Sequence, residues 1–207
     1  VKPLKYVLSA PMSYGANESA ESDDQNLPRY IRITDLTENG TLKADTFKSL
    51  PWDKAHGYLL ADGDILLARS GATVGKSFLY REHHGNAAFA GYLIKAQFDK
   101  EKVLPEYIYT YLQSHSYWEY IGGSNIQSTI QNVSAEKYSN MVVPIPDTSE
   151  QATIVAALDR ETTRIDTLID KTTRSIDLLK ERRSALITAA VTGKIDVRGK
   201  PHEPATP

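Results

Sequence analysis

The chain has 207 residues, a formal net charge of −2 at pH 7 and no Cys, so disulfides and thiolate metal sites are excluded. Its five His include no pair at helical ligand spacing, and we expect no metal site. The first residues lack the charged, apolar and small order of a signal peptide, and no apolar run approaches membrane-spanning length, so we expect a cytoplasmic protein.

Short strands are the expected elements of the first hundred residues. Residues 4–8 predict a strand, residues 29–34 alternate in side-chain character with period two, and residues 87–95 predict a further strand. The apolar run at 65–69 predicts a buried strand, and 77–80 predicts the next one after a Gly-bearing turn. We therefore expect mostly antiparallel β-structure, with a loop or short helical turn at residues 51–57.

A short helix is predicted from residue 105 to about residue 121. Pro105 at the first turn and Gly122-Gly123 at the end fit helix start and stop signals. Its aromatic side chains are able to stack on nucleic-acid bases, but a stripe at helical spacing is more often core, which is the interpretation we favour. An amide-rich loop follows at residues 122–131.

The longest predicted element runs from residue 148 to residue 191 without Gly or Pro. Apolar residues recur on one side of it and charged residues on the other, as in an amphipathic helix. We name the apolar side the seam; it consists of Ile154, Leu158, Ile165, Leu168, Ile169, Ile176, Leu179 and Leu186. At about 1.5 Å per residue this helix is roughly 60 Å long, too long to lie on one small globular domain.

We therefore predict an α+β protein in three parts. A globular, mostly β domain with a short helix covers residues 1–147, a long coiled-coil helix covers 148–193, and a flexible tail covers 194–207. A helix folded back along its own domain is the alternative. Because no second long heptad segment occurs, we expect the seam to pair with another copy of this helix or with a different protein.

The loop after the 65–69 strand resembles a phosphate-binding P-loop. A P-loop has four residues between its glycines and leads into a helix. Only three residues separate Gly71 from Gly75, and strand-like residues follow, so a nucleotide-hydrolysing site is disfavoured. We interpret the loop as a polar tip that contacts phosphates or base edges, with a functionless exposed hairpin as the alternative. Its candidate DNA-binding residues are Arg69, Ser70, Thr73 and Lys76.

A second polar group lies in the amide-rich loop. Amide side chains suit adenine edges, and the candidate residues there are Asn125, Gln127, Ser128 and Gln131. Arg32, near the end of a predicted strand, is a further candidate for a phosphate contact. No Ser-His-Asp set and no carboxylate pair in a recognisable context is evident, so we predict no catalytic residue.

Several stretches of the sequence occur together: DGDILLARSGATVGK at 62–76, LPEYIYTYL at 104–112, GSNIQSTIQ at 123–131, and VPIP at 143–146 followed by EQATIV at 150–155. Together with TGKID at 192–196, they resemble the specificity subunit of type I restriction-modification systems. In that family the subunit usually holds two target recognition domains and two conserved helices that pair as an antiparallel coiled coil. This sequence shows one domain and one helix.

The resemblance implies a non-catalytic, half-length specificity subunit that acts as a homodimer. Each copy would read one half of a bipartite site in double-stranded DNA, and the helices would set the distance between the halves. A heterodimer with another half-subunit is also open. The implied partners are modification subunits, which carry the S-adenosylmethionine site, and optionally restriction subunits that use ATP; the chain itself would hold no cofactor.

The charge distribution limits what this protein does alone. Residues 1–147 contain 14 Lys or Arg against 17 Asp or Glu. Phosphate contacts supply most of the affinity of sequence-independent DNA binders, so we expect weak DNA binding unless partner subunits embrace the duplex. Two alternatives of other classes are a coiled-coil adaptor that binds only protein and a nucleotide-dependent enzyme that uses the Gly71–Ser77 loop.

Overall fold

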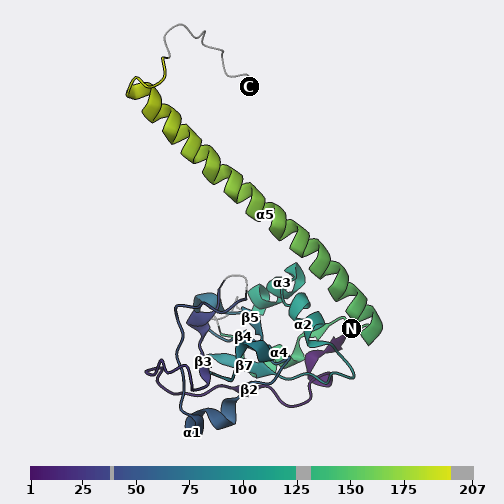
Figure 1. Ribbon diagram of the computed structural model, residues 1–207. Helices are drawn as coiled ribbons and strands as arrows, with labels where there is room; N and C mark the ends of the chain where they lie inside the picture. Colours follow the sequence, from purple (N-terminus) through teal and green to yellow (C-terminus); the bar gives the residue numbers. More distant parts are fainter. Residues whose placement is uncertain (38–39, 125–131, 197–207) are drawn as a thin grey trace. The chain divides into compact units, whose positions relative to one another are not determined.

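The computed structural model describes residues 1–37, 40–124 and 132–196. The chain divides into two compact units, Val1–Ala156 and Ala157–Pro207. The first unit is rich in short strands, and the long helix α5 (Thr148–Val191) follows them in the sequence (Figure 1). The α+β class predicted from the sequence is therefore confirmed.

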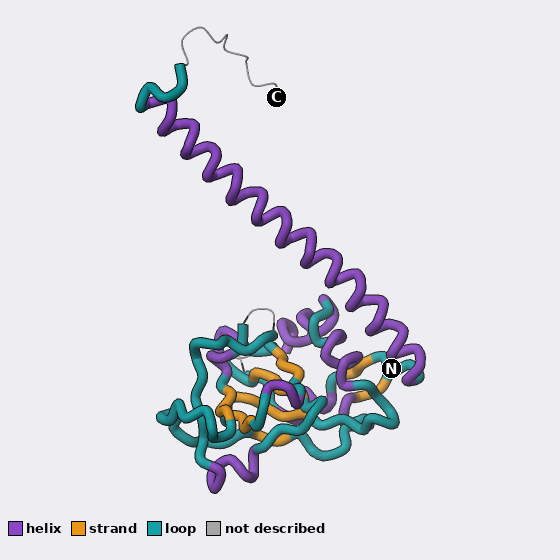
Figure 2. The backbone as a smooth tube through the Cα atoms, viewed as in Figure 1, coloured by secondary structure: helices purple, strands orange, loops and turns teal. Residues whose placement is uncertain are grey.

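A four-stranded sheet forms the centre of the first unit, whose strands are orange in Figure 2. Its neighbouring strands are all antiparallel. Its order is β2 (Ser13–Tyr14), β7 (Leu93–Ala96), β4 (Ile65–Ala68) and β5 (Ser77–Leu79). Strand β4 is buried along its whole length because both of its faces are covered. Ile65 and Leu67 point into one hydrophobic cluster, whereas Leu66 and Ala68 point into another.

Three short helices cover the first of these faces: α2 (Pro105–Tyr111), α3 (His115–Ser124) and α4 (Ala135–Asn140). The predicted single helix at 105–121 is wrong in two respects: the chain breaks it at residues 112–114, and α3 continues through Gly122-Gly123, the predicted stop signal, to Ser124. At the break the Ser114 Oγ accepts a hydrogen bond from the backbone N–H of Tyr117 at 3.3 Å and so starts a new helix. The core interpretation is confirmed for Tyr107, which is buried, whereas Trp118 stays 41% exposed.

The other face of the sheet is covered by a parallel pair of strands, β3 (Arg29–Ile31) and β6 (Ala87–Phe89). The predicted strand at 29–34 is shorter than expected, since the 3-10 helix η2 (Ile33–Asp35) follows it. The predicted strand at 87–95 is two strands, β6 and β7. Between them the Gly91 N–H donates to the carbonyl of Ala16 at 2.8 Å, which ties this turn to a distant segment.

The first residues join the segment that precedes α5. Strand β1 (Lys2–Pro3) pairs antiparallel with β8 (Val142–Val143). The strand predicted at residues 4–8 is wrong, because the chain forms the 3-10 helix η1 (Leu4–Tyr6) there. The Leu4 N–H donates to the carbonyl of Met141 at 2.9 Å, so a partner more than a hundred residues away fixes the backbone of this segment.

The remaining elements are short turns of helix: α1 (Trp52–Ala55), η3 (His56–Tyr58), η4 (Gly71–Thr73) and η5 (Glu82–His84). The loop or short helical turn predicted at 51–57 is confirmed by α1.

Before β4, the buried carboxylate of Asp64 accepts hydrogen bonds from the Ala61 N–H at 2.9 Å and from Gln97 Nε2 at 3.1 Å. Burial raises the pKa of Asp64, and these two donors act in the opposite direction.

Helix α5 begins in a fixed position because the fully buried side chain of Gln151 holds its first turn. Gln151 Oε1 accepts a hydrogen bond from the Leu104 N–H at 2.8 Å. Its Nε2 donates to the carbonyls of Pro146 at 2.8 Å and of Lys102 at 3.2 Å. One amide therefore makes hydrogen bonds to three partly buried backbone groups.

Gly193, with φ +72°, lies just past the end of α5. The N–H groups of Gly193 and Lys194 donate to the carbonyls of Ala190 and Ala189 at 3.2 and 2.8 Å, as at a helix C-terminus closed by glycine. In the part of the chain that the structure describes, no helix has the length and apolar character needed to cross a membrane. Residues 197–207, which hold most of the predicted flexible tail, lie outside the described residues.

We predict that Gln151→Ala lowers the free energy of unfolding of the first unit by about 2–4 kcal/mol, because three partly buried backbone groups lose the hydrogen bonds that the Gln151 side chain gives them. Urea denaturation followed by tyrosine and tryptophan fluorescence measures this change. The matched control is Thr153→Ala, an exposed position on the same turn, with an expected change below about 0.5 kcal/mol. Equal midpoints for the two variants would contradict the role given to Gln151.

Candidate nucleic-acid interface

The polar loop lies between β4 and β5, as predicted. Arg69 directly follows β4, the 3-10 helix η4 forms the tip, and Lys76 directly precedes β5. A strand rather than a helix follows the loop, so the helix N-terminus that a P-loop requires is missing here. Gly71 and Gly75 have φ values of +77° and +88°, and a Cβ on Gly75 would lie 2.9 Å from the Trp118 ring. The second glycine is therefore required by both backbone angle and space.

Two buried tyrosines hold the base of this loop from inside. The Tyr117 hydroxyl on α3 donates to the carbonyl of Gly75 at 2.5 Å, and the Tyr138 hydroxyl on α4 donates to the carbonyl of Ala68 at 2.8 Å. Burial raises the pKa of both phenols above the usual value, so both hydroxyls stay protonated and remain donors. The loop is thus fixed at both of its ends before any ligand arrives.

Arg69 is the best-defined candidate for reading a ligand. Its guanidinium carbon lies 4.7 Å from the centre of the Tyr14 ring, close enough for a cation–π contact. Its Nε is buried and has no hydrogen-bond partner among the described residues. A buried guanidinium nitrogen without an acceptor is energetically costly.

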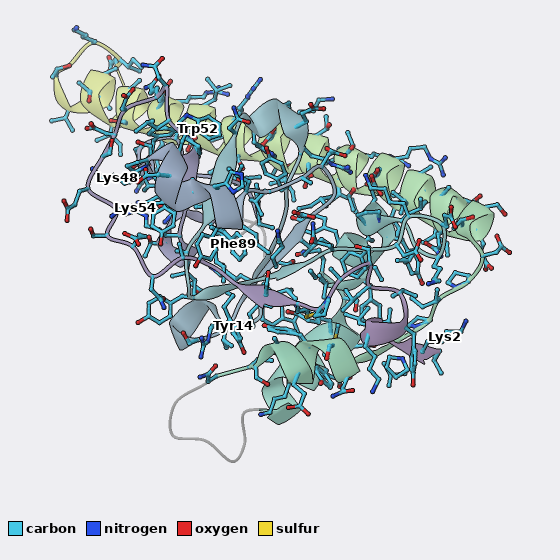
Figure 3. All side chains as sticks on the ribbon, turned by 90° about the horizontal axis from the view of Figure 1, so that it is seen from below. Lys2, Tyr14, Lys48, Trp52, Lys54 and Phe89 are labelled. Carbon is cyan, nitrogen blue, oxygen red and sulfur yellow. The ribbon has the colours of Figure 1, made fainter. Side chains whose placement is uncertain are left out.

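Three segments that are distant in the sequence meet around Arg69. Its N–H donates to the carbonyl of Tyr92 at 3.0 Å, and its carbonyl accepts from the Val133 N–H at 2.8 Å. Ser70 pairs with Asn132, and the Tyr14 hydroxyl accepts a hydrogen bond from the Ala135 N–H at 3.2 Å. Tyr14, labelled in Figure 3, is 42% exposed and Tyr92 is 65% exposed, so both side chains reach the surface.

Sequence reasoning did not identify Tyr14, Tyr92 or Asn132 as parts of this surface. Tyr14 lies between the predicted strands at 4–8 and 29–34, and Tyr92 lies within the predicted strand at 87–95. The sequence signal for Tyr92 is an aromatic residue directly after a glycine, Gly91-Tyr92, and this signal is weak by itself. Thr73 and Lys76 lie on the predicted loop, and each is partly buried.

The other predicted DNA-binding residues differ in their placement. Arg32 contacts Asp35 rather than the loop: its Nη2 lies 2.7 Å from Asp35 Oδ1, and it also donates to the Thr46 carbonyl at 2.8 Å. Asp35 is fully buried, so this ion pair has a structural role, and the phosphate contact stays a prediction. The predicted amide-loop residues, Asn125, Gln127, Ser128 and Gln131, lie outside the described residues.

The seam of α5 is largely exposed. From Leu158 onward its apolar side chains are 42–62% exposed, with Leu158 the least and Leu179 the most. Ile154 differs, because it packs against the core of the first unit. An exposed apolar stripe of this length on a helix indicates a protein partner.

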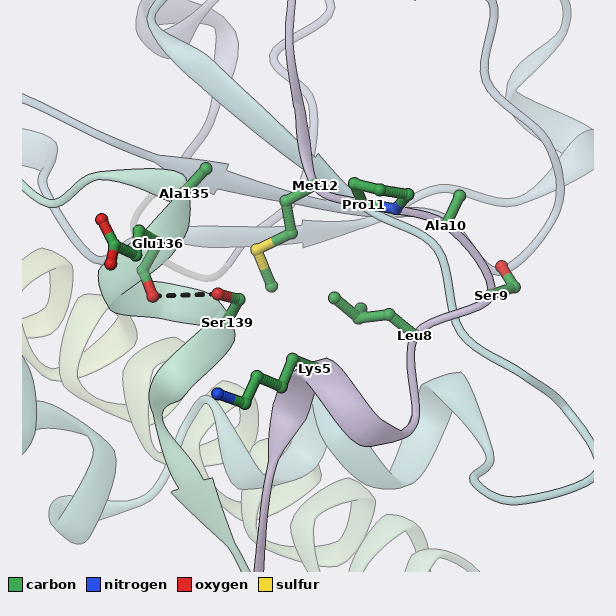
Figure 4. A pocket seen from close by; sticks show the side chains of 9 residues that line it. All are labelled: Lys5, Leu8, Ser9, Ala10, Pro11, Met12, Ala135, Glu136 and Ser139. Carbon is green, nitrogen blue, oxygen red and sulfur yellow. Dashed lines mark hydrogen bonds between the residues drawn. The ribbon is translucent and has the colours of Figure 1, made fainter.

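A shallow groove of about 460 Å³ lies between residues 8–12 and α4 (Figure 4). Leu8, Pro11, Met12 and Ala135 line it, and the Ser139 hydroxyl at its rim donates to the Glu136 carbonyl at 2.9 Å. Lys5, Ser9 and Glu136 also line it, so the lining is mixed in polarity. Among the described residues there is no group of three or more His, Asp or Glu able to hold a metal ion.

Residues 16–177 match the family model described as the type I restriction modification DNA specificity domain. The type I restriction enzyme StySPI specificity subunit of Salmonella potsdam is 28% identical over 139 residues, which are 64% of this chain and 29% of that protein. The match to the family model covers the loop after β4, the helices behind it and the larger part of α5.

Solved structures of the same kind share the fold. The HsdS subunit from Thermoanaerobacter tengcongensis superposes with a TM-score of 0.65 at 16% identity, over 98% of this chain and 50% of that one. A chain from a structure of a type I R-M system gives 0.72 at 18% identity, over 91% and 44%. The S subunit from M. genitalium gives 0.55 at 16% identity, over 82% and 40%. The chain thus spans half or less of the length of each of these relatives.

We predict that Tyr117→Phe lowers the free energy of unfolding by about 1–3 kcal/mol, because the buried Gly75 carbonyl loses the hydrogen bond at 2.5 Å from the Tyr117 hydroxyl. Tyr138→Phe is the matched control and is expected to cost less, about 0.5–1.5 kcal/mol. The Ala68 carbonyl keeps a second hydrogen bond, from the Gly75 N–H at 3.0 Å, in that variant. Denaturation midpoints measure both changes, and the reverse order would refute this account of the loop.

Proposed function

The chain belongs to the type I restriction-modification DNA specificity family, and from this membership we propose that it is the sequence-reading subunit of such a system. In this proposal the first unit reads one half of a bipartite DNA site, and α5 pairs with α5 of a second copy. Modification subunits bind the pair and methylate the DNA, so this chain performs no catalysis itself. The observation that carries the proposal is the family match, which includes both the polar loop and most of α5.

The loop after β4 supports the reading role. Arginine recognises the O6 and N7 acceptors of guanine with two donors, and a good pair of this kind discriminates by about 1–3 kcal/mol. Arg69 presents a planar group against Tyr14 on a loop whose two ends are already held by tyrosine hydroxyls. Little conformational freedom is then lost on binding. In this role Ser70 and Thr73 contact base edges or phosphates, and Lys76 contacts a phosphate.

The spacing along α5 supports a helical partner. Leu158, Ile165, Thr172, Leu179 and Leu186 recur every seventh residue. A second row lies four residues after each of the first four: Thr162, Ile169, Ile176 and Arg183. Alternating steps of four and three are the pattern of a two-stranded coiled coil. We propose the α5 helix of a second copy as the partner, because its seam has the same spacing.

The charges beside the seam favour one antiparallel register. In an antiparallel pair, the residues on one side of the seam face residues on the same side of the seam in the other helix. With a two-fold axis between residues 170 and 171, Glu161 faces Arg182 of the other copy, and Asp159 faces Lys180. Ile165 then packs opposite Ile176, and Ile169 opposite Thr172. Each ion pair occurs twice by symmetry, and no like charges meet at these flanking positions.

The partners complete the proposed complex. The modification subunits hold S-adenosylmethionine and methylate adenine, and a restriction subunit, where present, uses ATP; the chain needs no cofactor of its own to read DNA. Identical copies on a two-fold axis would read half-sites that form an inverted repeat.

Replacing the base-reading residues is expected to change the methylated sequence. We expect Arg69→Gln to cost about 1–3 kcal/mol of binding free energy and to relax one base position. We expect Lys76→Gln to lower the slope of log K against log salt by about 0.9 and to leave the recognised DNA sequence unchanged. The complex with co-expressed modification subunits is used to map methylated adenines and to titrate with salt. An unchanged pattern and affinity after replacing Arg69, Ser70, Thr73 and Lys76 together would reject the loop as the reading site.

Charge reversal tests the dimer and its register. We expect Glu161→Arg and Arg182→Glu each to weaken self-association several-fold, because each creates two like-charge pairs in the dimer, and the double variant to restore it. Sedimentation equilibrium at low salt measures the dissociation constants. The control pair is Asp170→Arg with Arg174→Glu, which lie outside the seam and are expected to show no such rescue. Rescue by the control pair, or none by the first pair, would contradict this register.

A further inference from the structure

The charges of α5 are sorted by side, although the helix as a whole is neutral. It contains seven Lys or Arg and seven Asp or Glu. At about 100° per residue, one group of acids falls within a sector of roughly 60° and one group of bases within an adjacent sector of roughly 80°. The acidic stripe consists of Asp159, Asp166, Asp170, Asp177 and Glu181, and the basic stripe consists of Arg160, Arg164, Lys171 and Arg174.

The basic stripe is accessible and does not belong to the seam. All four side chains are exposed. Two of them form ion pairs with Glu161, at 3.3 Å from Arg160 Nε and 3.9 Å from Arg164 Nη1, and both of these arginine side chains remain more than 70% exposed. Exposed pairs of this kind are worth about 0–1 kcal/mol, so they do not prevent another anion from binding.

Pairing two copies brings their basic stripes together. A two-fold axis that relates antiparallel helices runs perpendicular to the plane of the pair, so the same side of each helix appears on the same face. The dimer then has one basic and one acidic face. With the axis between residues 170 and 171, Lys171 of both copies lies at the centre, and Arg160 of the two copies marks the ends, about 32 Å apart along the axis.

We propose that this basic face binds the phosphate backbone of the DNA that lies between the two half-sites. The inference rests on the proposed function and adds a second DNA contact to it, one that reads no sequence. The eight cations of the face extend over about one turn of B-DNA, roughly 34 Å. The acidic stripe on the opposite face repels phosphate there, so the duplex has one side on which to lie.

The experiment compares salt dependence in the full chain. Arg164, Lys171 and Arg174 are replaced together by Gln, which keeps the helix propensity and removes six charges from the dimer. Binding to a 40-base-pair duplex of arbitrary sequence is titrated with salt. The expected result is a slope of log K against log salt that is smaller in magnitude. The decrease is about 0.9 for each phosphate that the face no longer neutralises, so the largest decrease is about five units of slope. The dimer mass is expected to stay the same.

Two further variants separate the possible outcomes. Asp170→Asn with Asp177→Asn, on the acidic face, is the control and is expected to leave the slope unchanged; an equal shift there would reduce the effect to net charge and overturn the proposal. Arg69→Gln with Lys76→Gln reports on the reading loop. A slope that falls for the loop variant but not for the helix variant overturns the spacer contact and leaves the proposed function standing. If the helix variant keeps the slope of log K against log salt but no longer binds modification subunits in the absence of DNA, the face is a protein contact. This result also overturns the proposal.

Discussion

The apolar seam of α5 is the constraint on which the rest of the account depends. A 44-residue helix has no means of burying one side of itself, and Ile154 and Val155 near its start pack against the core of the first unit. Complete burial of a Leu or Ile side chain is worth about 1.5–3 kcal/mol, whereas an exposed ion pair is worth about 0–1 kcal/mol. In the proposed dimer the seam therefore supplies the free energy of association. The charged residues beside it would select the partner and the register.

Buried hydrogen bonds fix the ends of functional segments in the first unit as well. Gln151 holds the start of α5 through three backbone groups, and two tyrosine hydroxyls hold the ends of the polar loop. These contacts are buried and protected from solvent, so they resist thermal motion better than surface contacts do. The side chains of the proposed reading residues, Arg69 and its neighbours, are not needed for these anchoring bonds. If the loop reads DNA as proposed, the recognised sequence can therefore change without loss of the fold.

The sequence predicted best what depends on local pattern. The run Ile65–Ala68 forms a strand because it is continuously apolar, and α5 forms because no Gly or Pro interrupts its heptads. Contacts between residues that are far apart in the sequence could not be predicted from the local sequence pattern. Leu4 is fixed by Met141, and Arg69 lies against Tyr14, 55 residues away, so neither the 3-10 helix at the N-terminus nor the aromatic part of the interface was visible. The break at Ser114 has a sequence signal, because serine often caps a helix N-terminus, but the apolar pattern of the longer helix outweighed this signal.

One distance tests the central claim most directly. The chain has no Cys, so a single Ser184→Cys variant carries one spin label per copy on the exposed side of α5. An antiparallel pair centred between residues 170 and 171 predicts about 40 Å between the two labels, from a rise of about 1.5 Å per residue. Pulsed electron paramagnetic resonance of the full chain measures this separation. The absence of any dipolar signal, or a separation near the width of two adjacent helices, about 10 Å, would contradict the account.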